Sequence, residues 1–257
     1  MSINLNVTKV GQGPNLVFLH GWGVNSGVWQ PLIDILANEY CITTIDLPGY
    51  GKNHKELPEP YDIGSVSKLI AAHLPADCVL IGWSLGGLIA QQVAYDFPEK
   101  LQRLVLICSS PKFAKDLGWP GIDKDVLMLF ARQLSLDFSK MLERFLMIQA
   151  MGSENAKFDV KTIKQNVQQY PNPSETALLA GLKMLENVDL RQQLSTLAIP
   201  CHLFLGRLDS LVPAAISEHL AECCPGVNIE VIAHASHAPF ISDTDGFKKQ
   251  LKAVLHR

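Results

Sequence analysis

Residues 78–87 read CVLIGWSLGG, and this stretch decides the fold. Its first part, Cys78–Gly82, is apolar throughout, which is typical of a strand that is covered on both faces of a parallel sheet. Apolar residues at helical spacing follow over Leu85–Phe97, and Pro98 then ends the helix. The string GWSLG at 82–86 matches G-x-S-x-G, which places a serine on a strained strand-to-helix turn. We therefore expect the Ser84 hydroxyl at the carboxyl edge of the sheet, where open α/β sheets bind ligands.

Strands and helices alternate on both sides of this stretch. Apolar runs predict five more strands, over Asn15–His20, Tyr40–Asp46, Arg103–Cys108, Cys201–Gly206 and Asn228–Ile232. Helical spacing predicts three more helices, over Val28–Ala37, Ile63–Leu74 and Phe240–Leu255. This alternation favours an α/β fold with a mainly parallel, doubly wound sheet.

The alternation stops between about residues 111 and 188, where only helical patterns occur. They cover Val126–Leu134, Phe138–Met151 and Ala177–Leu185, and turn signals at 119–121 and 170–173 separate them. We interpret this segment as an inserted helical cap. The predicted organisation is an α/β core of residues 1–110 and 189–257 and a cap of residues 111–188.

A nucleophilic serine needs a base, and the base needs a third group that orients it. In the fold that carries this serine turn, the chain order is serine, then acid, then histidine. Asp209 follows the predicted strand Cys201–Gly206, and His237 follows the strand Asn228–Ile232. Because carboxyl ends of parallel strands share one edge, we expect both side chains to meet Ser84 there.

Three alternatives compete with this assignment. Asp209 is also a candidate N-cap for a helix that starts within residues 210–213. His234 competes as the base, but His237 directly precedes the Ala-Pro-Phe that opens the last helix and is preferred. Asp46 competes as the acid, but it ends an early strand and would reverse the chain order.

Acyl transfer also needs hydrogen-bond donors that face the developing oxyanion. The backbone N–H of Leu85, directly after the serine, is the first predicted donor. The loop after the strand Asn15–His20 reads His20-Gly21-Trp22-Gly23, and we assign the second donor to the Trp22 N–H. The Trp22 side chain is expected either to line the acyl pocket or to belong to the core.

Composition excludes several classes of function. The chain has 257 residues and a net charge of -3, which gives no basic footprint for nucleic-acid binding. The N-terminus lacks a secretory signal pattern and no run is long enough to span a bilayer, so we expect a cytoplasmic protein without membrane contact. The six cysteines lack metal-site spacing and are expected to be small buried hydrophobes, and the chemistry requires no metal or organic cofactor.

Four strings carry a resemblance to a known family. They are HGWG at 20–23, DLPGYG at 46–51, GWSLGG at 82–87 and ASHAPFIS at 235–242, with WPGI at 119–122 and ERFL at 143–146 in the cap. Together they resemble the α/β-hydrolase family over the whole chain. One departure is Asn53, where many relatives have serine after the DxPGxG string.

Within this family the chain resembles the carboxylesterases of biotin synthesis, which implies hydrolysis of the methyl ester of pimeloyl-acyl carrier protein. The resemblance also implies a substrate-binding set formed by Trp22, Ser84, Leu85, Phe145, Leu146, Met147, Ile148, Gln149 and His237.

An acyl carrier protein is acidic, so a partner surface for it should be basic. Lys140 and Arg144 are four residues apart on one predicted helix, and Lys157, Lys161 and Lys164 share a face of the next. We predict carrier contacts at Lys140, Arg144, Lys157 and Lys161, against the alternative of an ordinary solvated surface with mixed charges.

Other functions fit the same residues. On one scaffold, a broad short-chain carboxylesterase or a carbon–carbon bond hydrolase would use the same serine, acid and base. A non-catalytic binding protein of this fold is less well supported, because it has no need for a serine, an acid and a histidine at strand ends. We expect a monomer.

Overall fold

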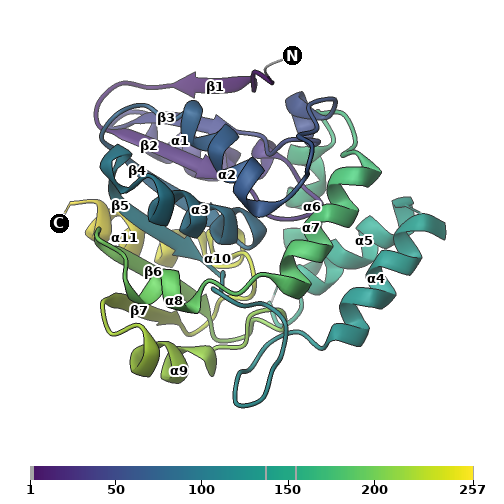
Figure 1. The fold of residues 1–257 in the computed structure, drawn as a ribbon. Coiled ribbons are helices and arrows are strands. Elements are labelled where there is room, and N and C mark those ends of the chain that lie inside the picture. The colour runs from purple at the N-terminus through teal and green to yellow at the C-terminus, as the bar shows by residue number, and fades with distance from the viewer. Residues whose placement is uncertain (1–2, 137, 154, 257) are drawn as a thin grey trace.

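The computed structural model describes residues 3–136, 138–153 and 155–256, and a seven-stranded sheet lies at its centre (Figure 1). The strands are β1 (Val7–Val10), β2 (Asn15–Leu19), β3 (Cys41–Ile45), β4 (Cys78–Trp83), β5 (Leu101–Ile107), β6 (Cys201–Gly206) and β7 (Val227–Ile232). Their order across the sheet is β1-β3-β2-β4-β5-β6-β7, and all neighbours are parallel except β1 and β3. The predicted parallel α/β sheet is confirmed.

The strand β1 is an addition to the predicted set. It pairs antiparallel with β3 at the edge of the sheet, and three of its four residues are exposed. A short exposed edge strand has no continuous apolar run, so hydrophobicity alone does not reveal it. Strands β2 to β6 are mostly buried because helices cover both faces of the sheet.

Alternate residues of the strands point into two separate cores. One core joins Leu80, Leu104 and their neighbours to helices α2 (Ile63–Ala72), α3 (Leu85–Asp96), α8 (Arg191–Ser195) and α9 (Ile216–Cys223). The other joins Val79, Val105 and their neighbours to α1 (Gln30–Leu36) and α11 (Thr244–Leu255). The sheet is therefore covered on both faces, as a doubly wound fold requires.

The segment between β5 and β6 is helical, and it lies beside the sheet at the right of Figure 1. Its four long helices are α4 (Lys124–Leu136), α5 (Phe138–Gln149), α6 (Ala156–Val167) and α7 (Glu175–Asn187), called the helical segment below, and the short α8 follows them before β6. Two isolated β-bridges, between Ala114 and Ile122 and between Asp116 and Trp119, close a loop before α4. The helices were predicted, whereas the division of the chain into a core and a cap stays a prediction.

Two helix predictions differ from the structure by more than one or two residues at an end. The C-terminal helix is broken into α10 (Pro239–Ser242) and α11, because the Asp243 side chain accepts a hydrogen bond from the Gly246 N–H and starts a new helix. The helix expected directly after Asp209 begins only at Ile216, so that prediction was wrong. Asp209 is therefore not the N-cap of α9, although its carboxylate organises the intervening turn.

All six cysteines are free thiols, and five of them are buried, in line with the prediction; Cys223 is exposed. Among the described residues, no helix is long and apolar enough to cross a membrane.

Candidate active site

Ser84 occupies a strained turn between β4 and α3. Its φ of 53° is a left-handed value that residues other than glycine rarely adopt. The turn is fixed by three contacts: the Ser84 N–H donates to the Ile107 carbonyl at 3.0 Å, the Ser84 carbonyl accepts from the Gly87 N–H at 2.9 Å, and it also accepts from the Ser109 hydroxyl at 2.9 Å. The surrounding backbone therefore holds the serine in this conformation.

Glycine is required on both sides of this turn. A Cβ atom on Gly82 would lie 2.6 Å from the Gly86 carbonyl oxygen. A Cβ atom on Gly86 would lie 2.4 Å from the His20 carbonyl oxygen and 2.5 Å from that of Leu19. Helix α3 thus starts in direct contact with the end of β2, which brings Ser84 and Leu85 next to the loop that contains Trp22.

His237 and Asp209 meet in the interior, as the sequence predicts. The His237 Nδ1 lies 2.8 Å from Asp209 Oδ2, and the two residues are 1% and 7% exposed. Asp209 Oδ1 accepts hydrogen bonds from the N–H groups of Leu211 and Val212, at 2.8 and 3.0 Å. Because the carboxylate oxygen can only accept, Nδ1 carries the proton and Nε2 has the free lone pair.

An accessible lone pair of this kind is what a general base requires. The His237 Nε2 atom is buried and has no hydrogen-bond partner among the residues that the structure describes. Buried polar atoms normally have a partner, and exceptions are frequent where chemistry occurs. An imidazole in this tautomer is able to accept a proton from a serine hydroxyl.

His234 and Asp46, the alternative base and acid, do not take part in the contact between His237 and Asp209. His234 is exposed on the same loop. Asp46 is buried, but its two oxygens accept from the Ser26 and Lys52 N–H groups, at 2.6 and 2.8 Å. Neither residue joins the pair formed by Asp209 and His237.

Trp83, just before the serine, has a positioning role that the sequence did not reveal. Its indole Nε1–H donates to the His237 carbonyl at 2.7 Å, and the two rings are 5.6 Å apart between centroids. The same residue that leads into the strained turn thus holds the backbone of the histidine loop. Apolar strand patterning gives no signal for such a bond, because it joins residues 154 positions apart.

His20 fixes the loop of the second predicted donor. Its Nδ1 donates to the Gly21 carbonyl at 2.8 Å, and its Nε2 accepts from the Leu47 N–H at 3.0 Å. Burial lowers the pKa of His20, which favours this neutral form. The Gly21 carbonyl and the Trp22 N–H belong to one planar peptide unit, so a bond to the first sets the direction of the second.

The Trp22 side chain connects the sheet to the helical segment. It is fully buried, its Nε1–H donates to the Leu178 carbonyl at 2.8 Å, and its ring lies edge-on to Phe145 at 4.7 Å. Burial confirms the prediction of Trp22 as a core residue, whereas its role in lining an acyl pocket stays a prediction.

The remaining predicted substrate residues fall into two groups. Phe145, Leu146 and Gln149 are buried, and Ile148 is partly buried against the same core as Trp22. Met147 is 57% exposed on the other side of α5, so the structure does not bring it to the site. Neither amide atom of Gln149 has a hydrogen-bond partner within residues 3–136, 138–153 and 155–256, although the side chain is completely buried.

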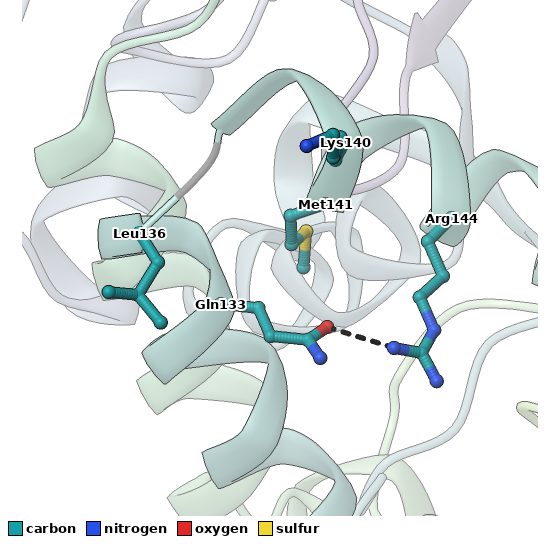
Figure 2. Close-up of a pocket in the computed structure, with 5 residues that line it drawn as sticks. All are labelled: Gln133, Leu136, Lys140, Met141 and Arg144. Atoms are coloured by element: carbon teal, nitrogen blue, oxygen red, sulfur yellow. Dashed lines mark hydrogen bonds between the residues drawn. The ribbon is translucent and has the colours of Figure 1, made fainter.

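Three of the four predicted carrier-contact residues line two surface pockets, and the fourth, Lys161, is exposed on α6. Figure 2 shows Lys140 and Arg144 around a pocket of about 350 Å³, where Arg144 donates to the Gln133 Oε1 at 3.3 Å. Lys157 lines a second pocket of about 460 Å³ with Met147 and Met151. Lys164, which shares the predicted helix face of Lys157 and Lys161, forms an ion pair with Glu143 at 2.5 Å.

Comparison with known proteins places this geometry in a family. A family model described as the alpha/beta hydrolase fold matches residues 14–244. The chain belongs to the α/β-hydrolase family. This α/β-hydrolase is 48% identical, over 96% of both chains, to the pimeloyl-[acyl-carrier protein] methyl ester esterase of Pseudoalteromonas atlantica. It is 44% identical, over 95% of its own length and 96% of the relative, to the esterase of the same name from Aeromonas hydrophila.

Solved structures agree on the fold of this α/β-hydrolase. An esterase from Exiguobacterium antarcticum superimposes with a TM-score of 0.88 at 23% identity, over 98% of this chain and 96% of that one. An enol-lactonase from Burkholderia xenovorans gives 0.84 at 18% identity, over 98% and 96%. Because these neighbours have different activities, their likeness supports the fold alone.

Proposed function

We propose that the chain is a serine carboxylesterase that hydrolyses the methyl ester of pimeloyl-acyl carrier protein to pimeloyl-acyl carrier protein and methanol, for biotin synthesis. The observation that carries the reaction type is the buried His237 imidazole, which is bonded to Asp209 through Nδ1 and has no partner at Nε2 among the described residues. The substrate is proposed from the names of the relatives at 42–48% identity. The enzyme works in the cytoplasm as a monomer.

The first half of the reaction forms an acyl-enzyme. His237 Nε2 takes the Ser84 hydroxyl proton while Ser84 Oγ attacks the ester carbonyl carbon. The N–H groups of Leu85 and Trp22 donate to the developing oxyanion, a contribution worth about 3–4 kcal/mol for each donor. The tetrahedral intermediate collapses, and methanol leaves with the proton from His237.

The second half releases the acid. A water molecule gives a proton to His237 Nε2 and attacks the acyl carbon, and the proton then returns to Ser84 as the carboxylic acid departs. Asp209 stays ionised throughout, keeps the imidazole in the required tautomer and stabilises the imidazolium. Every step uses residues of this chain, and none needs a cofactor.

The acyl chain lies against the inner face of the helical segment, which we propose to be a cap over the core. The Trp22 and Phe145 rings, which are in edge-on contact, provide its apolar wall, together with buried Leu146. Gln149 is one turn beyond Phe145 on α5, and its unpartnered amide provides a donor and an acceptor for a polar group of the substrate. Leaving that amide unpaired costs about 1–3 kcal/mol in the free protein, which a bound polar group offsets.

The carrier protein docks on the outer face of the cap. Lys140 and Arg144 in the pocket of Figure 2, with Lys157 and Lys161 on α6, provide positive charge for its acidic surface. Met147, although turned away from Ser84, lies with Lys157 in an apolar pocket on this face. We therefore include Met147 among the proposed carrier-contact residues.

Methanol release tests this proposal. The wild-type protein should release methanol from pimeloyl-acyl carrier protein methyl ester, and Ser84→Ala should reduce kcat by at least about 10⁴-fold. Ser67→Ala, which alters a buried serine of α2, is the matched control and should retain activity. A Ser84→Ala variant with near-wild-type turnover would refute the mechanism.

The carrier is tested by comparing substrates. A preference for the carrier-bound ester over the free methyl ester and p-nitrophenyl acetate should weaken at high salt, because surface attraction is screened. Lys140→Glu with Arg144→Glu should weaken it likewise, whereas Lys68→Glu, on α2, should not. Activity on the small esters alone would indicate a general carboxylesterase, and failure to react with a serine-directed phosphonate would indicate a non-catalytic binding protein.

A further inference from the structure

A buried thiol lies beside the histidine and the aspartate, and the proposed mechanism does not use it. Cys108 follows β5, is completely buried, and has a left-handed φ of 43°. Its Sγ lies 3.6 Å from the Ser236 carbonyl oxygen, next to His237 in the chain. One ligand atom each from Cys108, Asp209 and His237 lies within 4.8 Å of the others.

We propose that Cys108, Asp209 and His237 form an inhibitory site for a thiophilic divalent cation of the Zn²⁺ class. The inference extends the proposed function, because it assumes that His237 is the general base. Thiolate, imidazole and carboxylate are the three ligand types that Zn²⁺ takes from proteins. Three protein ligands and one open position is also a common arrangement of zinc sites.

The geometry needs only a small adjustment. With Zn–S of about 2.3 Å and Zn–N or Zn–O of about 2.0–2.2 Å, ligand atoms around a tetrahedral ion are about 3.3–3.7 Å apart. The His237–Asp209 contact of 2.8 Å must open by roughly half an ångström, while the thiol must move inward. Asp209 keeps its second oxygen on the Leu211 and Val212 N–H groups during this change.

Charge balance favours the ion in spite of burial. Burial, with the nearby Asp209 carboxylate, raises the pKa of the Cys108 thiol well above its usual value, so the sulfur is protonated without an ion. Binding of Zn²⁺ releases that proton. The dication, one thiolate, one carboxylate and a neutral imidazole then sum to zero, so no net charge is buried.

Occupation of this site stops the reaction for a specific reason. The ion takes the lone pair of His237 Nδ1, and the proton of the neutral ring then resides on Nε2. A protonated Nε2 donates and cannot accept the Ser84 proton, so acylation stops. Cys108, Asp209 and His237 are 0%, 7% and 1% exposed, and inhibition should therefore develop slowly.

Inhibition kinetics test the site. Preincubation with Zn²⁺ should inhibit hydrolysis of p-nitrophenyl acetate, a chelator should restore it, and Mg²⁺ at the same concentration should not inhibit. Cys108→Ala and Cys108→Ser should each raise the half-inhibitory Zn²⁺ concentration by about tenfold or more, relative to their own uninhibited rates. The double variant Cys223→Ala/Cys224→Ala removes an adjacent thiol pair with Sγ atoms 3.5 Å apart and should remain as sensitive as wild type.

A direct measurement separates this inference from the proposed function. Cd²⁺ bound to a thiolate absorbs in the ultraviolet, and the Cys223→Ala/Cys224→Ala protein should show this band with one equivalent of Cd²⁺, whether or not any ester is hydrolysed. Adding Cys108→Ala should abolish it. Equal inhibition of wild type and Cys108→Ala, or a band that survives the loss of Cys108, would overturn the inference.

Discussion

At Gly181, helix α7 packs directly against residues of the proposed oxyanion site. A Cβ atom at this position would lie 2.7 Å from Trp22 Cδ1 and 3.1 Å from Leu85 Cδ2. Both neighbours belong to the residues that supply the proposed donors. Gly181→Ala therefore adds one methyl group at the contact between the helical segment and the reaction centre.

The size of the effect follows from these distances. Ordinary carbon contacts are about 3.5–4.0 Å, so the methyl group requires a displacement of roughly 1 Å. The Trp22 ring cannot turn away easily, because Leu178 and Phe145 hold it. Overpacking costs about 1–3 kcal/mol, and alanine in a helix returns about 0.5–1 kcal/mol. The net loss lowers Tm by only a few degrees in a chain of this size.

Catalysis should suffer more than stability. A misplacement of about 1 Å at a reacting group can cost about 10²-fold in rate, so kcat/KM should fall by about 10- to 100-fold. The measurement is kcat/KM for p-nitrophenyl acetate and for the carrier-bound methyl ester, with Tm recorded in parallel. Gly64→Ala in α2 is the matched control, since the nearest atom to its Cβ is 3.7 Å away. A folded Gly181→Ala enzyme with unchanged kcat/KM would refute the reasoning.

Three further substitutions have expected outcomes. Asp209→Asn should lower kcat by about 10⁴-fold with little change in KM, because the amide favours the wrong imidazole tautomer; a loss below tenfold in steady-state kinetics would contradict this. His20→Ala leaves the Gly21 carbonyl and the Leu47 N–H unpaired in the core, which should reduce both Tm and kcat. A lower Tm with unchanged kcat would show that His20 does not orient the oxyanion loop. Burial raises the pKa of Asp159, so its ionised form destabilises the folded state at neutral pH, and this penalty fades as the pH falls through the raised pKa. Asp159→Asn should therefore raise Tm by about 2–4 °C at pH 7, and less in acid, as calorimetry would measure.

The parallel strands and the contact between Asp209 and His237 could be predicted because each has a local signal. Apolar runs mark strands that are buried on both faces, and chain order then places Asp209 and His237 at the same edge as Ser84. The edge strand β1 lacks that signal, since three of its four side chains face solvent. The break between α10 and α11 depends on one capping bond to Gly246, which the apolar pattern across it conceals.

Contacts between residues far apart in the chain could not be predicted from the sequence. Trp83 reaches the His237 carbonyl across 154 positions, and Cys108 enters the same cluster from a third strand. A tryptophan and a cysteine in apolar runs are ordinary core residues by pattern, and only the packed structure reveals what their polar atoms touch. Helical periodicity alone, likewise, did not determine which face of α5 carries Met147 outward.

Substrate entry has to be reconciled with a site in which Ser84 is 3% and His237 1% exposed. Hydrogen bonds join the core to the region of α6 and α7: Ser174 donates to the Gly49 carbonyl, Asn25 to that of Val167, and Trp22 to that of Leu178. Helix α5 instead meets Trp22 through the Phe145 ring, an apolar contact without directional bonds. Among the described residues, parting the Phe145 and Trp22 rings breaks no hydrogen bond, whereas moving α7 breaks the bond from Trp22 to the Leu178 carbonyl, so we expect opening at α5 to cost less. The acyl chain should therefore enter beneath α5, the helix that also carries Lys140 and Arg144 on the proposed carrier surface.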